Sequence, residues 1–270
     1  MREDADGEFE RIRLSVRRRR GVDLAFYKHS YVQRRIQARM RSQRCPDQAS
    51  YARLLASQPE EAGLLLAALS IKVTSFFRNP GLYSFLARRV LPEILRTQRG
   101  RTTRIWSAGC ATGEETYSLA ALVADHTPRV DPDRVRVIGT DTDREAILAA
   151  RRAVYPVAAL RHVPAELQRR FFRAQLPHGT CRPAEEVLSL VRFRMESLLE
   201  EPPAGAFDLI LCRNVLIYFE PSLQHRIFER FARALRPGGW LALGRVERLP
   251  GVARGAFEIV NVKERVYIRT

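Results

Sequence analysis

The chain has 270 residues, of which 46% are hydrophobic and 28% are charged, a composition ordinary for a folded protein of one large or two modest domains. No apolar run approaches the ~20 residues that a membrane span needs, and arginines interrupt any secretory core near the N-terminus. The four cysteines are scattered without a C-x-x-C pair, which argues against a metal or disulfide set. We therefore expect a cytoplasmic protein with no metal site.

The net charge of +16 comes almost entirely from arginine, since the chain has only three lysines, Lys28, Lys72 and Lys263. An arginine bias of this kind can reflect codon composition alone. The distribution suggests a second reading, because the many basic residues between Arg11 and Arg53 are accompanied by only two acids, Asp23 and Asp47. A basic region of this kind fits an acidic partner: nucleic acid, anionic lipid or a carboxylate-rich protein.

Residues 9–70 show helical periodicity. Apolar residues recur at helical spacing in two early stripes: Phe9, Ile12 and Val16, then Val32, Ile36 and Met40. Arg34, Arg35 and Arg39 fall on other faces of the second helix, so we expect most of them to be exposed. A longer helix, Pro80 to Leu95, follows. We expect an N-terminal helical domain at 1–79 and a linking helix within 80–103.

From Arg104 onward the pattern alternates between strands and helices, which is typical of a parallel sheet covered on both faces. The expected strands are 105–107, 135–139, 207–211 and 240–243, followed by a terminal hairpin, 257–260 with 266–268. A hairpin in this place distinguishes a Rossmann-like methyltransferase from a two-half dinucleotide fold. We therefore expect an α/β domain over 104–270.

A turn of small residues, Ser107 to Glu115, follows the first expected strand and opens a helix. Small residues let a cofactor approach the backbone closely. Glu114 and Glu115 at the start of the helix would repel a pyrophosphate, but they suit a cation that carries hydroxyl groups, such as S-adenosylmethionine (SAM). The alternative is an ordinary helix start with glutamates favoured by the helix dipole.

Asp141 ends the next expected strand, where an acidic side chain can accept hydrogen bonds from the ribose hydroxyls of an adenosine ligand. A lone aspartate after a strand is more often a turn or a helix cap. Asp143 is the better candidate for the cap, which leaves Asp141 for the ligand.

Five segments together carry a resemblance to a known family: Val73–Arg78, Ala108–Ser118, Asp141–Asp143, Cys212–Phe219 and Leu235–Gly239. In order, spacing and residues they resemble the CheR-type chemoreceptor glutamate methyltransferases, and the likeness extends from about Phe9 to Ile268. The resemblance implies a Rossmann-like SAM-methyltransferase domain, a small N-terminal all-helical domain, and a small β insert near 173–192.

The resemblance also implies which residues act. Those assigned to the cofactor SAM are Thr74, Arg78, Gly109, Glu115, Asp141, Ser197, Leu198, Arg213 and Asn214. Arg78 and Tyr218 would lie nearest the transferred methyl group as the catalytic residues. The implied acceptor is a glutamate in the acidic, helical cytoplasmic domain of a chemoreceptor, and we expect Arg34, Arg35 and Arg39 to contact it.

The expected β insert contains Pro177, Gly179 and Pro183. In some members of the family this insert docks a peptide at the receptor's C-terminus. Because prolines weaken hairpin pairing, we expect this chain to act independently of such a peptide.

Three positions depart from the family pattern: Lys72 and Ser197, each in place of an asparagine, and the Gly244–Glu247 turn, which carries Arg245 and Val246 where the family has histidine and serine. They leave open a catalytically weak, SAM-binding scaffold. A nucleic-acid methyltransferase fits less well, because the chain has no Asn/Asp-Pro-Pro-aromatic motif and no Pro-Cys nucleophile.

Overall fold

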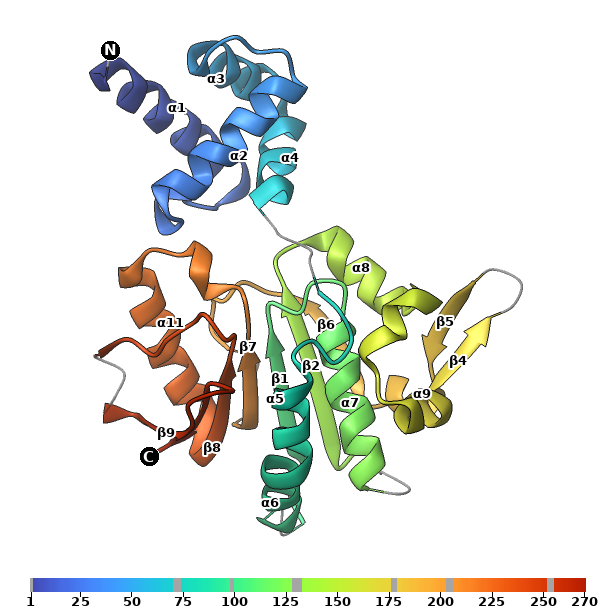
Figure 1. Cartoon of the computed structure of the whole chain (residues 1–270). Coiled ribbons are helices and arrows are strands. Elements are labelled where there is room, and N and C mark those ends of the chain that lie inside the picture. Colours follow the sequence, from blue (N-terminus) through green and yellow to red (C-terminus); the bar gives the residue numbers. More distant parts are fainter. Residues whose placement is uncertain are drawn as a thin grey trace. The chain divides into compact units, whose positions relative to one another are not determined.

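The structure, a computed structural model, describes residues 2–69, 74–97, 100–127, 133–175, 179–202, 206–251 and 255–270. Lys72 lies outside the described residues. The chain divides into two compact units, one comprising Met1–Ile71 with Tyr218–Gln224, the other Lys72–Ile217 with His225–Thr270. Figure 1 shows the helices of the first and the sheet of the second.

The smaller unit is helical, as predicted. Its elements are α1 (Arg2–Arg20), η1 (Leu24–Phe26), α2 (His29–Ser42), α3 (Gln48–Ser57) and α4 (Pro59–Leu69). Aspartates begin two of them, because the Asp23 carboxylate accepts a hydrogen bond from Ala25 N and the Asp47 carboxylate accepts one from Ser50 N. These caps give the chain its entry into η1 and α3.

The predicted apolar stripes form the core of this helical unit. Ile12 and Val16 of α1 and Val32 and Ile36 of α2 are fully buried, and Tyr51, Leu55 and Leu65 from α3 and α4 complete the cluster. Period-3.6 burial therefore explains why these segments become helices that pack on one another.

The larger unit is built on a seven-stranded sheet. Its strand order is β6 (Val191–Met195), β2 (Val135–Asp141), β1 (Thr103–Ala108), β7 (Phe207–Cys212), β8 (Leu235–Leu243), β10 (Val266–Arg269) and β9 (Phe257–Asn261). The first five strands pair in parallel, and β10 pairs antiparallel with both β8 and β9. The predicted α/β fold class and the terminal hairpin are confirmed.

Helices cover both faces of this sheet (Figure 1). They are α5 (Pro80–Phe85), η2 (Leu86–Val90), α6 (Leu91–Thr97), α7 (Glu114–His126), α8 (Arg144–Arg152) and α11 (Pro221–Ala234). Residues 80–97, which we expected as one linking helix, form α5, a π-helical turn η2, and α6, and they belong to the larger unit. No helix among the described residues is long and apolar enough to cross a membrane.

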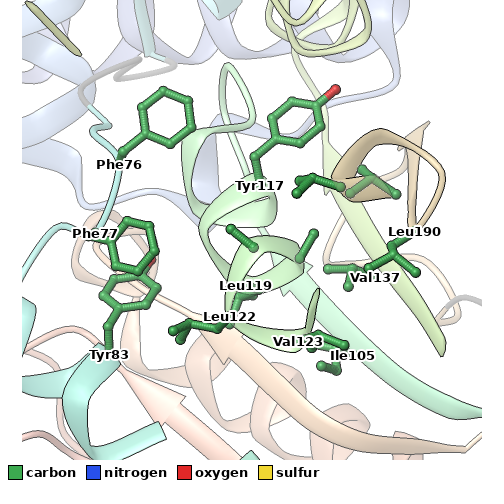
Figure 2. Packing of buried hydrophobic residues seen from close by; sticks show 14 of the residues in the cluster. Phe76, Phe77, Tyr83, Ile105, Tyr117, Leu119, Leu122, Val123, Val137 and Leu190 are labelled. Atoms are coloured by element: carbon green, nitrogen blue, oxygen red, sulfur yellow. The ribbon is translucent and has the colours of Figure 1, made fainter. Parts of the chain in front are cut away.

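Alternate residues of β1 face opposite layers. Ile105 lies in the cluster beneath α7, whereas Trp106 packs against Phe231 of α11 with ring centroids 5.5 Å apart. Figure 2 shows the α7 side, where Leu122 and Val123 lie near Ile105. Because both faces of the sheet are buried, the strand sequences are continuous apolar runs and do not alternate between apolar and polar residues.

One strand begins earlier than predicted. We expected it at Trp240 after a turn, but β8 begins at Leu235, because Phe207 pairs with Leu235 before Leu209 pairs with Trp240. The residues between Leu235 and Trp240 form an irregularity in the ladder, and Gly238 takes a φ of +72° there.

The predicted β insert is a separate sheet in the order β3 (Tyr155–Pro156), β5 (Thr180–Pro183), β4 (Phe172–Gln175). It is flanked by η3 (Val157–His162), α9 (Ala165–Phe171) and α10 (Glu185–Leu188). Pro183 lies opposite Phe172 at the end of the β4–β5 ladder, so this proline does not prevent the two strands from pairing. Pro177 lies outside the described residues.

Candidate active site

The predicted cofactor residues of the larger unit gather at one edge of the sheet. Gly109 follows β1, Asp141 ends β2, Ser197 follows β6 and Arg213 follows β7. These strands are parallel neighbours, so their carboxyl ends meet at the same edge. Ligands of open α/β sheets bind outside the carboxyl ends of the strands, so the topology assembles the site from segments far apart in the sequence.

The turn after β1 approaches its surroundings closely. Gly109 has a φ of +79° and Gly113 a φ of +95°, a left-handed conformation that favours glycine. A Cβ atom on Gly109 would lie 2.5 Å from Cγ2 of Val215. The N–H groups of Gly109 and Cys110 both donate to the carbonyl oxygen of Thr140, at 2.8 and 2.9 Å. The turn is therefore fixed against the end of β2.

Asp141 fixes the same turn with its side chain. One carboxylate oxygen accepts a hydrogen bond from Ala111 N and the other from Asp143 N, each at 2.9 Å. Burial raises the pKa of the Asp141 carboxyl, and the two backbone donors act against that rise. Each oxygen can accept further hydrogen bonds, so ribose hydroxyls fit here. Asp143 caps α8 through Ala146 N, as predicted.

The segment after β6 lies beside Asp141, because Glu196 N donates to the carbonyl oxygen of Asp141 at 3.1 Å. The hydroxyl of Ser197 accepts a hydrogen bond from Leu199 N, and the carbonyl oxygen of Leu198 accepts one from Arg230. Ser197 therefore stabilises its own turn. If Asp141 binds the ribose, the adenine attached to that ribose would lie nearby, so the position of Ser197 and Leu198 beside Asp141 suits their predicted role.

A buried ion pair crosses the site. Arg213 donates to Glu115 at 3.0 Å and to the carbonyl oxygen of Arg78 at 2.8 Å, while Ser107 donates to the other Glu115 oxygen at 2.8 Å. Burial disfavours the charged guanidinium, but Glu115, together with Tyr83 and Glu247, more than offsets this, so the pKa of Arg213 is raised. The pair thus connects β1, β7 and the segment that contains Arg78.

The segment around Arg78 is held in a strained conformation. Phe77 and Asn79, on either side of Arg78, have φ values of +51° and +66°. This left-handed conformation is unfavourable for a bulky residue such as Phe77, whereas asparagine adopts it more readily. The fully buried Phe76 and Phe77 anchor the segment (Figure 2), and Phe77 N donates to the Ser118 hydroxyl at 3.0 Å. Strain of this kind concentrates at functional sites. Thr74 is half-buried at its start.

Tyr218 packs within the helical unit rather than the sheet unit. It ends η4 (Leu216–Tyr218), four residues after Asn214, and its ring lies 4.6 Å from that of Tyr31 on α2. Its carbonyl oxygen accepts a hydrogen bond from Lys28 N at 2.9 Å. The predicted catalytic tyrosine is thus joined to the cofactor edge by the chain itself and is supported by the helices.

The three predicted acceptor-binding arginines differ in their surroundings. Arg34 is exposed, and Arg35 is half-buried with its guanidinium 5.2 Å from the Tyr31 ring centroid. Arg39 donates two hydrogen bonds to the buried Glu61, at 2.8 and 2.6 Å, and Glu61 also accepts one from Tyr51. Because Glu61 neutralises Arg39 inside the helical unit, Arg39 has less structural support as an acceptor-binding residue than the exposed Arg34, and its assignment stays a prediction.

Sequence reasoning missed two buried glutamates that hold other residues in place, Glu61 and Glu247. Glu61 lies 22 residues from Arg39, and nothing in helical periodicity marks an acid as a buried partner. Glu247, within the turn noted as departing from the family, accepts hydrogen bonds from backbone groups of the segment after β7. The one signal available was a glutamate four residues after the end of β8, in a turn that begins with Gly244.

The edge fits SAM by its chemistry. The turn of small residues admits close approach of a ligand, Asp141 provides an acceptor for ribose hydroxyls, and the buried acid Glu114 favours a cation. Glu115, which the sequence also offered for this role, is neutralised by Arg213. A parallel sheet of this order, closed by an antiparallel hairpin and carrying this edge, defines a SAM-dependent methyltransferase.

Comparison with known families narrows this class. The model for the SAM-binding domain of CheR methyltransferase matches residues 72–266, and the model for the CheR all-alpha domain matches residues 7–70. The chain therefore belongs to the CheR methyltransferase family.

Relatives agree with this assignment. "Chemotaxis protein methyltransferase 2" of Pseudomonas aeruginosa is 39% identical over 89% of this chain and 86% of its own length. The chemotaxis protein methyltransferase of Salmonella typhimurium is 35% identical over 93% and 86%. An uncharacterized 104.1 kDa protein of Rhodobacter capsulatus is 36% identical over 91% of this chain, which spans only 26% of that protein.

Proposed function

We propose that this chain transfers a methyl group from SAM to glutamate side chains of a chemoreceptor, forming carboxyl methyl esters in the cytoplasm. The observation that carries the proposal is the match of both CheR domains, in order, over nearly the whole chain. The relatives named as chemotaxis protein methyltransferases support the same substrate class.

The chemistry asks little of the protein beyond position. Bound SAM supplies an electrophilic methyl group and a thioether leaving group. A glutamate has a pKa of about 4.3 and is already ionised at neutral pH, so the acceptor oxygen needs no general base. Opposite charges neutralise each other as the oxygen–carbon bond forms and the carbon–sulfur bond breaks. Orientation and exclusion of water therefore supply most of the rate enhancement.

The roles proposed for individual residues follow from these needs. Asp141 would hold the ribose hydroxyls, supported by its place at the end of β2 and its remaining acceptor capacity. The Glu115–Arg213 pair would keep the floor of the site rigid, and the bond from Arg213 to the carbonyl oxygen of Arg78 fixes that segment's backbone.

Arg78 would steer the acceptor carboxylate, and Tyr218 would donate a hydrogen bond to one of its oxygens while the other reacts. The strained backbone around Arg78 supports a functional role for this position. The remaining cofactor assignments rest on the family: Thr74, Gly109, Ser197, Leu198 and Asn214.

The acceptor surface would include Arg34 and Arg35 of α2, because the exposed Arg34 suits an acidic helical partner. Arg39 is left out of this surface, since Glu61 pairs with it. Independence from a receptor docking peptide stays a proposal and has lost part of its support, because β5 pairs with β4 despite Pro183.

The decisive experiment incubates the protein with labelled SAM and chemoreceptor cytoplasmic fragments, followed by mild alkali. Glutamate methyl esters release volatile labelled methanol under these conditions, whereas methylated bases and lysines do not. Receptor fragments whose methylatable glutamates are changed to alanine are the control. Absence of alkali-labile label on all receptor fragments would overturn the proposal. Adding the C-terminal receptor peptide in trans tests docking, since a peptide-independent enzyme is unaffected by it.

A further inference from the structure

Glu247 has a hydrogen-bonding arrangement that the mechanism above does not use. Its carboxylate is 3% exposed and accepts hydrogen bonds from four backbone N–H groups: Asn214 at 2.8 Å, Val215 at 2.9 Å, Leu216 at 2.8 Å and Gly244 at 2.7 Å. Three of these donors are consecutive residues. Successive backbone N–H groups of this kind form a concave anion-binding site, and here the anion is a side chain of the same protein.

The three consecutive donors lie between the proposed site residues. Arg213, which pairs with Glu115, directly precedes them, and Tyr218 follows two residues after the last donor. Asn214 has a φ of +60°, a left-handed conformation that asparagine adopts more readily than other residues with a Cβ. The chain therefore makes a left-handed turn directly after Arg213, and the Glu247 carboxylate holds that turn.

The approach of the carboxylate requires Gly244. A Cβ atom at this position would lie 2.6 Å from the Glu247 Oε2 atom and 2.9 Å from Asn214 N. Any larger residue would push the acceptor away from its donors. Gly244 and Glu247 thus form one device at the end of β8, and it contacts the segment that follows β7.

We propose that Glu247 is a positioning residue for methyl transfer, which holds Asn214–Leu216 so that the adjoining Arg213 keeps its place in the site. It touches neither substrate nor cofactor and acts through the backbone of that segment. The inference rests on the proposed function for its catalytic consequence, whereas the clamp itself is a statement about the segment's hydrogen bonds.

The test compares Glu247→Gln with the parent by hydrogen–deuterium exchange and by steady-state methyl transfer to a receptor fragment. The amide keeps one acceptor oxygen but turns an NH2 group toward backbone donors. Exchange at Asn214–Leu216 should rise about tenfold or more, while β1 stays protected. At saturating SAM, kcat should fall about tenfold or more, the size expected when charge-assisted hydrogen bonds are lost, with a smaller change in the receptor KM.

Three further variants guard against simple loss of folding. Gly244→Ala should reproduce the effect, and Glu247→Asp, which keeps the charge on a shorter side chain, should restore part of kcat. Asp208→Asn is the matched control, because Asp208 is a carboxylate of similar burial, 4% exposed, that pairs with Arg101 near the start of β7 rather than with the Asn214–Leu216 backbone. It should leave exchange in that segment and kcat within about twofold of the parent, as expected for a site outside the network.

Unchanged exchange at Asn214–Leu216 in Glu247→Gln would overturn the clamp. Faster exchange with an unchanged kcat would overturn the positioning role. A parent protein that methylates no receptor would refute the proposed function instead, and the exchange measurement would still decide the clamp.

Discussion

The two units of this molecule bury charge in different ways. In the helical unit one buried acid, Glu61, neutralises a single arginine, Arg39, and joins α2 to α4. In the sheet unit the buried Glu115 and Glu247 and the half-buried Asp141 bind backbone N–H groups, a hydroxyl and Arg213 at one edge. Buried carboxylates therefore hold helices together in one unit and shape a site in the other.

Because of this difference, substitutions of buried acids should affect stability in one unit and function in the other. Loss of the helical ion pair should weaken folding, whereas changes at the sheet edge should act on binding and rate. Each of the following variants tests that separation, from the largest expected effect to the smallest.

The largest expected effect is on folding. Glu61→Ala leaves Arg39 without its partner and removes an acceptor from Tyr51, so the helical unit should lose about 3–5 kcal/mol of unfolding free energy. Urea unfolding followed by circular dichroism measures it. Glu93→Ala, which breaks an exposed pair with Arg89, is the control and should change stability by less than about 1 kcal/mol.

The Arg39–Glu61 pair also tests whether Arg39 contributes to the acceptor surface. The double variant Arg39→Met with Glu61→Leu replaces the ion pair by apolar side chains, and such exchanges are often neutral for stability. It should keep its receptor KM. A KM that rises in this stably folded variant would return Arg39 to the acceptor surface.

At the sheet edge, Arg78→Ala should lower kcat by about ten- to a hundredfold, the range for a lost charged hydrogen bond of about 1.5–3 kcal/mol. Binding of S-adenosylhomocysteine should change little, because Arg213 contacts the backbone of Arg78 and not its side chain. Tyr218→Phe should give a smaller loss, about two- to tenfold, since the phenol is a neutral donor to the carboxylate whereas the Arg78 guanidinium is a cation. A full kcat in either variant would remove that residue from the reacting centre.

Asp141→Asn should weaken S-adenosylhomocysteine binding by about 1–3 kcal/mol, measured by calorimetry. Asp143→Ala is the neighbouring control, because it removes the cap of α8, at about 1 kcal/mol of stability, and should leave the cofactor affinity nearly unchanged. Equal affinities in parent and Asp141→Asn would contradict the ribose assignment.

Asp141 also predicts a pH dependence. Because burial raises its pKa in the folded chain, the folded state takes up this proton at a higher pH than the unfolded chain. Ionising the group therefore lowers stability as pH rises from the unfolded pKa through the folded one. Cofactor binding needs the ionised carboxylate, so it should weaken as pH falls through the folded pKa of Asp141. The Asp141→Asn variant should show no such pH dependence of binding.

The smallest effect concerns the acceptor surface. Arg34→Glu should raise the receptor KM a few-fold at low salt, and added salt should reduce the difference, because exposed charges act mainly on encounter. Arg53→Glu, the same charge change on an exposed residue of α3, should not. Equal KM values for the two variants would favour the reading that these arginines reflect composition alone.

Much of the fold followed from the sequence because local patterns dictate it. The helical spacing of Ile12 and Val16 and the buried run at 207–211 have physical causes that act over a few residues. Gly109 and Asp141 could also be proposed from the sequence. A tight turn after a strand favours a glycine such as Gly109, and the ribose of an adenosine ligand needs an acceptor such as Asp141. Family resemblance supplied the remaining site residues.

Tertiary structure decided which charged side chains are free. On sequence alone Arg34 and Arg39 are equivalent arginines of one helix, yet only Arg39 meets Glu61 from α4. Likewise, the four donors to Glu247 come from two segments joined only when β7 and β8 pair. Local periodicity carries no information about such contacts, because they form between residues that the chain brings together only when the whole core is packed.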